Sequence, residues 1–231
     1  MIALDSRLVR IVNKIKDTKL RSKVHELLQN PTIKIEGKSF SGISMEKSPA
    51  SMRQHHNYPG GFIEHTLALY ELCMSLSRIV QRIYKCKVDN DLVICGVLLH
   101  DVFKPATYIQ REGVYRRSDL AERVDHLTLA SAELIRRGFP LDAVHVVTAS
   151  HGQYGPIGPM TIEALVCHLG DYAEAKLNGD VLNAARFMFR EVTGEEAQGL
   201  DGKQAFAIVR VKTDRGWDGL KEYLSRKGFA S

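Results

Sequence analysis

The sequence predicts an all-α protein with a small β component. Apolar residues recur at helical spacing over residues 3–29, 62–84 and 161–178, which indicates amphipathic helices. The stretches that favour β-structure are short and few, at residues 32–35, 108–116 and 203–212. A chain of 231 residues fits one domain, or one domain with an appendage.

The first 53 residues are predicted as a basic, largely helical segment. The helical pattern of residues 3–29 ends at Asn30-Pro31. Residues 32–35 are a candidate strand, Glu36-Gly37 a turn, and residues 38–51 a loop rich in Ser and Gly. Residues 1–53 hold 11 Lys and Arg against 5 Asp and Glu, whereas the remainder holds 21 and 22. This excess favours either an anionic partner or a solvated helix face.

A central domain over residues 54–190 should contain most of the helices. After the helix of residues 62–84, an apolar helix spans residues 92–99, and a hairpin turns at Glu112-Gly113. Further helices are expected at residues 120–137, 142–150, 161–178 and 181–190.

Residues 191–231 are predicted as a strand–helix appendage. The stretch KQAFAIVRVK (residues 203–212) is the strongest strand candidate in the chain, and a short helix follows over residues 217–226. We expect part of this strand, residues 205–211, to pair with residues 32–35.

The sequence carries no sign of secretion or membrane insertion. No run reaches the roughly 18 apolar residues of a membrane span, and the N-terminus has early charges rather than a signal-peptide core. The four cysteines form no CxxC pair and are expected to be buried free thiols. A cytoplasmic location is therefore expected.

The stretch DLVICGVLLHDVFK (residues 91–104) is the strongest functional signal. Its apolar helix ends on His100 and Asp101. Burying an imidazole and an adjacent carboxylate after such an apolar helix costs free energy unless both groups have a polar or charged partner. A divalent cation is the natural partner for this pair.

Further candidate ligands occur on successive helices, mostly near helix ends. The set is His65, His100, Asp101, His126, His151 and the mid-helix Asp171. Imidazole nitrogen with carboxylate oxygen suits Mn, Fe, Co, Ni or Zn. A carboxylate can bridge two such ions about 3.5–4 Å apart, and a water between them becomes a hydroxide nucleophile near neutral pH.

This pattern resembles the HD-domain superfamily of metal-dependent phosphohydrolases, and His126 and His151 resemble the additional ligands of its two-metal members, such as the HD-GYP class. The segments HHNYPGGFIEHT, LLHDVFK, DHLTLA, TASHGQYGPIGP and TIEALVCHLGDYAEAKLN, within about residues 50–180, resemble the YhaM-type 3'-5' exoribonuclease branch. The resemblance implies an HD-domain helical bundle.

The resemblance also implies a role for each residue. One divalent transition metal would take His65, His100, Asp101 and Asp171, and a second would take His126 and His151 with Asp101 as the bridge. Lys104 would meet the scissile phosphate, so Asp101 and Lys104 are the predicted catalytic residues. Phe103 stands where the family motif has glycine, and the OB domain that often precedes this branch is missing.

Other polar residues have more open interpretations. His56 could contact the substrate phosphate or a metal-bound water, and His55 is expected on the surface. Tyr154 could stack on a base or sugar or simply anchor its loop. His168 could support the ligands as an outer contact or be a core residue. Arg116 and Arg117 could hold a phosphate or be solvated charges.

The leading hypothesis is a metal-dependent phosphohydrolase that acts on nucleotide phosphate esters or on short RNA or DNA. A nucleotide-binding regulatory module with little turnover is the main alternative, and the complete ligand set argues against it. A structural RNA-binding protein is a third possibility. The near-neutral charge of residues 54–231 argues against that possibility.

Overall fold

The computed structural model describes residues 4–112, 114–197 and 199–227 and confirms the all-α fold class. The helices in this part of the chain are α1 (Ser6–Val12), α2 (Thr18–Gln29), α3 (Gly61–Ile83), α4 (Asn90–Leu99), α5 (His126–Arg136), α6 (Leu141–Thr148), α7 (Ile162–Thr193) and α8 (Gly202–Arg226), with short 3-10 turns η1 (Lys104–Thr107) and η2 (Gly152–Tyr154). The strands are β1 (Ile33–Ile35), β2 (Lys38–Phe40), β3 (Tyr108–Arg111) and β4 (Val114–Arg117).

Helix α4 lies at the centre of the helical body. The Asp89 side chain caps it by accepting hydrogen bonds from two backbone N–H groups of the first turn. Helix α4 is apolar around its whole circumference, as expected for a buried helix, and it contacts α2, α3, α6 and α7. A Cβ on Gly96 would lie 2.3 Å from Val146 Cγ1, so glycine permits the close approach of α6. This packing places the C-terminal end of α4 in the interior.

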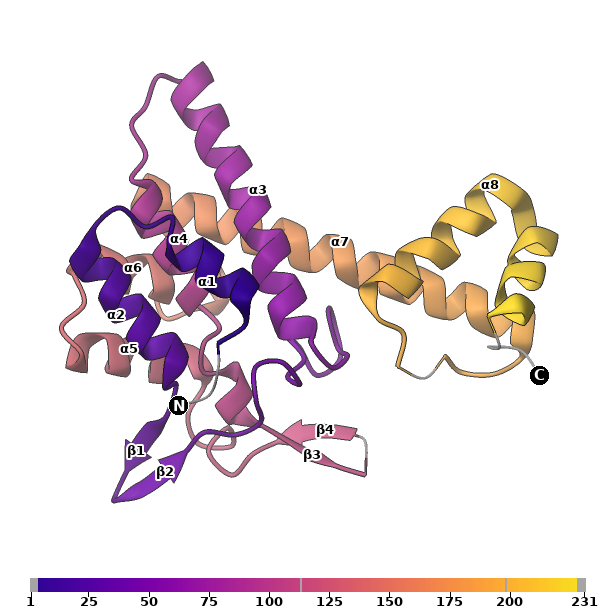
Figure 1. The fold of residues 1–231 in the computed structure, drawn as a ribbon, viewed down its shortest axis with the longest axis horizontal. Coiled ribbons are helices and arrows are strands. Elements are labelled where there is room, and N and C mark those ends of the chain that lie inside the picture. Colours follow the sequence, from indigo (N-terminus) through magenta and orange to yellow (C-terminus); the bar gives the residue numbers. More distant parts are fainter. Residues whose placement is uncertain (1–3, 113, 198, 228–231) are drawn as a thin grey trace.

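Helix α7 links the body to a second lobe (Figure 1). Its first half packs against α3 and α4, whereas its second half extends away from the body and α8 folds back upon it. Leu182 and Ala185 of α7 pack with Ala205 and Ile208 of α8 in a core separate from that of the body. Helix α7 ends at Gly194, whose φ of 75° is the left-handed conformation common at helix ends.

The predicted helix over residues 3–29 is two helices, because Asp17 caps the start of α2 after a short break. Both helices contribute to the same core as α4, where Leu8, Ile15 and Val24 are fully buried. The proposed domain boundary at residue 53 stays a prediction.

The predicted pairing of residues 32–35 with residues 205–211 is wrong. Strand β1 pairs antiparallel with β2, which lies in a stretch expected to be loop. Glu36 and Gly37 both have positive φ, and two such residues form the turn that suits a two-residue hairpin.

The predicted strand over residues 203–212 is also wrong, because these residues lie within α8. Asp201 and Gln204 form a reciprocal capping box that starts the helix. Ala205 and Ile208 then lie on one buried face against α7, and this packing overrides the β-propensity of the local sequence. The helix predicted over residues 217–226 continues α8 beyond a kink at Gly216.

The remaining local predictions are partly confirmed. Strands β3 and β4 form the expected hairpin, although Gly113 of its turn lies outside the described residues. Helix α5 begins at His126 rather than at residue 120, because Asp125 caps it there. All four cysteines are free; Cys86 is partly exposed and the other three are buried. Within the described ranges, no helix combines the length and apolarity needed to cross a membrane.

Candidate metal centre

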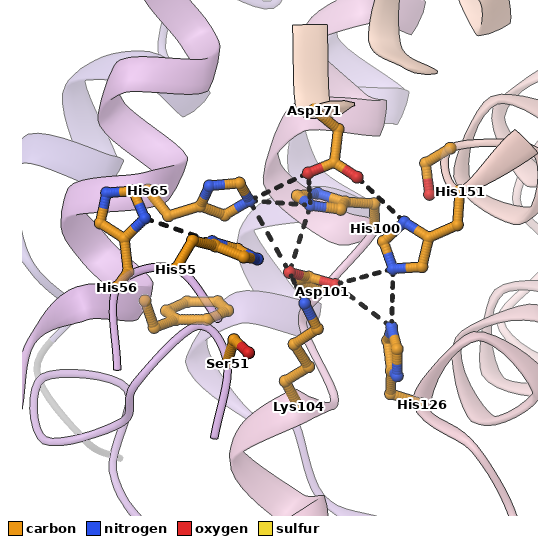
Figure 2. A network of polar contacts seen from close by, with 12 residues as sticks. Ser51, His55, His56, His65, His100, Asp101, Lys104, His126, His151 and Asp171 are labelled. Atoms are coloured by element: carbon orange, nitrogen blue, oxygen red, sulfur yellow. Dashed lines mark hydrogen bonds and ion pairs between the residues drawn. The ribbon is translucent and has the colours of Figure 1, made fainter. Parts of the chain in front are cut away.

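All six predicted ligands lie in one cluster in the body (Figure 2). They come from the start of α3, the end of α4, the start of α5, the turn after α6 and the first half of α7. Five helices or the turns that follow them therefore meet at one point. Apart from the adjacent pair His100 and Asp101, consecutive members of the cluster are 20 or more residues apart in the sequence. The cluster consists of His65, His100, Asp101, His126, His151 and Asp171.

Asp101 lies between two sets of imidazoles. Its Oδ2 atom is 3.3 Å from His100 Nε2 and 3.8 Å from His65 Nε2. Its Oδ1 atom is 3.3 Å from His126 Nε2 and 3.6 Å from His151 Nε2. The side chain is 1% exposed; the Lys104 ammonium lies 2.6 Å from Oδ2, but neither oxygen accepts a well-aligned hydrogen bond from the described residues. A buried carboxylate in this state fits a cation on each side.

We call the first set, His65, His100 and Asp171, the inner pocket. His65 Nε2 lies 3.4 Å from His100 Nε2 and 3.2 Å from Asp171 Oδ1, and all three residues are buried. The second set, Asp101, His126 and His151, is the outer pocket. Its two Nε2 atoms are 3.1 Å apart, and both imidazoles are about one-fifth exposed.

These separations fit metal ligation. Two atoms that each bind one ion at about 2.1 Å with a tetrahedral angle lie about 3.4 Å apart, and about 3.0 Å at an octahedral angle. The nitrogen and oxygen atoms of each pocket have separations in or near this range, at 3.1–3.8 Å. With the Asp101 oxygens divided between the pockets, the inner pocket offers four donors and the outer pocket three, a set that suits divalent ions.

Each of three imidazoles is oriented through its other ring nitrogen. His100 Nδ1 lies 3.2 Å from the Val97 carbonyl oxygen, and His151 Nδ1 lies 3.0 Å from Asp171 Oδ2. His65 Nδ1 lies 2.5 Å from Glu174 Oε2. When Nδ1 carries the hydrogen and donates it, the lone pair of Nε2 faces the pocket.

Charge in the cluster depends on burial and on close partners. Burial would lower the pKa of His100, but the adjacent Asp101 carboxylate outweighs it and raises that pKa to about 10 in the metal-free protein. Burial would raise the pKa of Asp101, but the positive His100 and Lys104 hold it well below its usual range. In the outer pocket, burial lowers the pKa of His126.

Lys104 lies inside the cluster. Its Nζ is 2.6 Å from Asp101 Oδ2, and the residue is 8% exposed. Phe103, which takes the place of the family's glycine, is fully buried in the core, and the following 3-10 turn η1 starts at Lys104. Burial would lower the pKa of Lys104, but the Asp101 charge raises it, so Lys104 is an ammonium at neutral pH.

The loop that precedes α3 also reaches the cluster. The prediction that His55 is on the surface is wrong, because His55 is buried with its ring 5.0 Å from that of His65. His56 Nε2 lies 3.3 Å from Glu174 Oε1. Burial, reinforced by the positive charge of His65, lowers the pKa of His55 to about 3 and that of His56 to about 2, so both are neutral.

The other predicted residues lie farther out. His168 Nδ1 lies 2.9 Å from the Ser150 carbonyl oxygen, and its ring fills the space beside Gly152, so it supports the turn that carries His151. Tyr154 is 82% exposed on η2. Arg116 and Arg117 are exposed on β4.

Glu174 and Asn178 were not predicted. Asp171, Glu174 and Asn178 follow one another at intervals of three and four residues along α7, so they share one helix face. This polar stripe in an otherwise mostly apolar helix is the signal that could have identified them.

The chain is similar to known proteins at the level of the family and of individual relatives. The family model described as HD domain matches residues 62–176. Dihydroneopterin 2',3'-cyclic phosphate phosphodiesterase from Methanocaldococcus jannaschii is 36% identical over 230 residues, covering 97% of this chain and 92% of that protein. The 3'-5' exoribonuclease YhaM from Listeria innocua serovar 6a is 28% identical over 143 residues, covering 56% of this chain and 43% of that protein. No solved structure matches.

Proposed function

Because this chain belongs to the HD domain family of metal-dependent phosphohydrolases, we propose that it cleaves phosphodiester bonds in small, nucleotide-like molecules at a centre of two divalent ions. The observation that carries this proposal is Asp101, whose two buried oxygens face two separate sets of imidazoles. His65, His100 and Asp171 would hold one ion, His126 and His151 the other, and Asp101 both.

The proposed reaction is hydrolysis of one phosphorus–oxygen bond. Bound divalent ions would supply a Lewis acid for the phosphate oxygens and a nucleophilic water near neutral pH. The water adds to phosphorus, the bond to the ester oxygen breaks, and a proton ends on that oxygen, which leaves a phosphomonoester and a hydroxyl group. The Lys104 ammonium would offset negative charge that develops on the phosphate.

A cyclic phosphate is the substrate class with the best support. The near-full-length relative is named for a 2',3'-cyclic phosphate, whereas the exoribonuclease match covers 56% of this chain. The stacking role of Tyr154 on such a ring stays a prediction, and the contact of His56 with Glu174 favours a supporting role over substrate binding.

The test is an assay of the metal-loaded protein with Mn²⁺, Fe²⁺, Co²⁺, Ni²⁺ and Zn²⁺ in turn. Its substrates are dihydroneopterin 2',3'-cyclic phosphate, a nucleoside 2',3'-cyclic phosphate, a phosphomonoester and a labelled RNA. We expect the cyclic phosphates to open to monoesters and the simple monoester to persist. Release of phosphate from the monoester alone would contradict the proposal.

An exoribonuclease activity is the second candidate, because Lys14, Lys16 and Lys19 are exposed near the N-terminus. If these residues hold RNA, affinity should fall steeply with salt, with a log–log slope of about −0.7 per neutralised phosphate. Replacing all three by Gln should then flatten the slope. An unchanged slope would mean that α1, α2 and their connection serve only as packed structure.

A further inference from the structure

We propose that Glu174 is a positioning residue that holds His65 with its Nε2 lone pair directed into the inner pocket. This inference rests on the proposed metal centre and adds to it a residue outside the predicted ligand set. Glu174 would act through His65 rather than by binding the reacting atoms.

The contact between the two side chains is short and enclosed. Glu174 Oε2 lies 2.5 Å from His65 Nδ1, with Glu174 6% and His65 0% exposed. A carboxylate cannot donate a hydrogen in its ionised form, so the hydrogen of this contact belongs to Nδ1, and Nε2 keeps the lone pair once His65 is neutral. That Nε2 atom faces Asp171 and His100 in the inner pocket. Glu174 therefore selects the tautomer that can ligate.

The same arrangement occurs at two other imidazoles of the centre. The Val97 carbonyl oxygen lies beside Nδ1 of His100, and Asp171 Oδ2 lies beside Nδ1 of His151. Glu174 differs from both of these acceptors. The Val97 acceptor is a neutral carbonyl and Asp171 is itself a predicted ligand, whereas Glu174 is a carboxylate that belongs to neither pocket. An ionised acceptor raises the basicity of the imidazole more than a neutral carbonyl does, which strengthens its bond to a metal.

Glu174 is itself held from the opposite side. Its Oε1 atom lies 3.3 Å from His56 Nε2, and the His56 backbone N–H donates to Asn178 Oδ1 at 2.7 Å. Asn178 and Glu174 are one helical turn apart on α7, so the loop before α3 docks on the same face that holds His65.

The docked loop has a backbone that only certain residues allow. His56 has a φ of 44°, and a Cβ on Gly61 would lie 2.1 Å from the His56 carbonyl oxygen. Glycine at residue 61 therefore permits the approach that brings His56 to Glu174. In this arrangement His56 supports Glu174 instead of contacting substrate.

The experiment compares the full-length variants Glu174→Gln and Glu174→Ala with wild type. Glu191→Gln, an exposed site on the same helix, is the matched control. Ions bound per chain and their affinities are measured with Zn²⁺ and Mn²⁺ by competition with a chelator. Histidine ¹⁵N NMR of the Zn²⁺-loaded protein reports which nitrogen of His65 carries hydrogen.

We expect Glu174→Ala to weaken the metal affinity of the inner pocket by about 10–100-fold. The affinity of Glu174→Gln should lie between those of Glu174→Ala and wild type, because its amide oxygen still accepts the hydrogen bond from His65 but carries no charge. The number of ions at saturating metal should be unchanged, and Glu191→Gln should match wild type. The hydrogen on His65 Nδ1 should exchange with water faster in both Glu174 variants. If Glu174→Ala does not fold, Glu174→Gln gives the answer.

Three results would overturn the inference. Affinity in both variants could equal that of Glu191→Gln, which would make the contact purely structural. Glu174→Gln could lose a whole ion at saturating metal, which would make Glu174 a ligand. If the wild-type protein bound no divalent ion, the proposed metal centre would fail together with this inference. That outcome differs from the first two because it is seen in the wild-type protein, without any variant.

Discussion

The inner and outer pockets share Asp101 but differ in their surroundings. The inner pocket is buried between α3, α4 and α7, and two of its imidazoles have fixed orientations. In the outer pocket, the imidazoles of His126 and His151 are about one-fifth exposed and come from helix ends joined to loops. For the proposed two-ion centre, this difference predicts that the inner pocket retains its ion more firmly and that solvent and substrate reach the outer pocket.

The strongest test of this comparison is loss of the residue that both pockets share. Asp101→Asn keeps the volume of the side chain but removes its charge, and we expect it to lose both ions. Turnover of a cyclic phosphate should fall by at least about 10³-fold, since loss of a single oxyanion donor already costs about 10²–10³. Metal analysis and kinetics measure both effects. Asp119→Asn, at an exposed position, is the control; full metal content in Asp101→Asn would refute the shared role.

The pockets should also separate by mutation. His126→Ala removes a ligand of the outer pocket alone, so we expect about one ion per chain to remain and turnover to fall strongly. His100→Ala should weaken the inner ion instead. Titration of each variant with Mn²⁺ distinguishes them. Equal loss of both ions from His126→Ala would show that the pockets do not fill independently.

Lys104 offers a change that should leave both pockets filled. Lys104→Met removes the ammonium beside Asp101, and we expect both ions and the fold to persist while turnover falls by about 10²-fold. Metal content and turnover are measured on the same preparation. Turnover within a few-fold of wild type would mean that the residue only completes the turn after α4, and metal loss would mean that Lys104 helps to hold Asp101.

A further test of the comparison is a difference in pH dependence between the two pockets. The pKa of His100 is raised to about 10 in the metal-free protein, so an ion entering the inner pocket must displace a proton at neutral pH. Affinity there should rise by up to about tenfold per pH unit between about pH 7 and 9. The lowered pKa of His126 means that this residue imposes no such requirement on the outer pocket. Binding titrations across this range test the difference.

The same shift has a consequence for stability. Because the pKa of His100 is higher in the folded than in the unfolded chain, protonation of His100 adds to the free energy of unfolding of the metal-free protein. This contribution is complete below the ordinary histidine pKa of 6.5 and is lost as the pH rises through about 10. Chelator-treated protein should therefore become less stable to urea between about pH 7 and 10, whereas metal-loaded protein should not show this contribution. Identical profiles for the two forms would contradict the assignment of His100.

The side chains of the cluster could be named as candidates from sequence, because the signal at His100 and Asp101 is local and the resemblance to the HD-domain superfamily implied the others; their role as ligands stays a prediction. His100 and Asp101 follow an apolar helix, and the cost of burying such groups follows from their chemistry alone. The helical class follows in the same way from the spacing of apolar residues. Even the error at residues 203–212 had a local remedy, because Asp201 and Gln204 form a capping box directly before the β-prone stretch.

What only the tertiary structure decided is which residues face one another across helices. Periodicity along α7 places Glu174 one turn from Asp171, but it does not show that His65 of α3 lies 2.5 Å away or that His56 lies behind it. The burial of His55 likewise depends on a loop that docks against α7 through Asn178. Sequence patterns specify the faces of single helices, whereas contacts over about 110 residues of chain arise from packing, which periodicity within one helix does not encode.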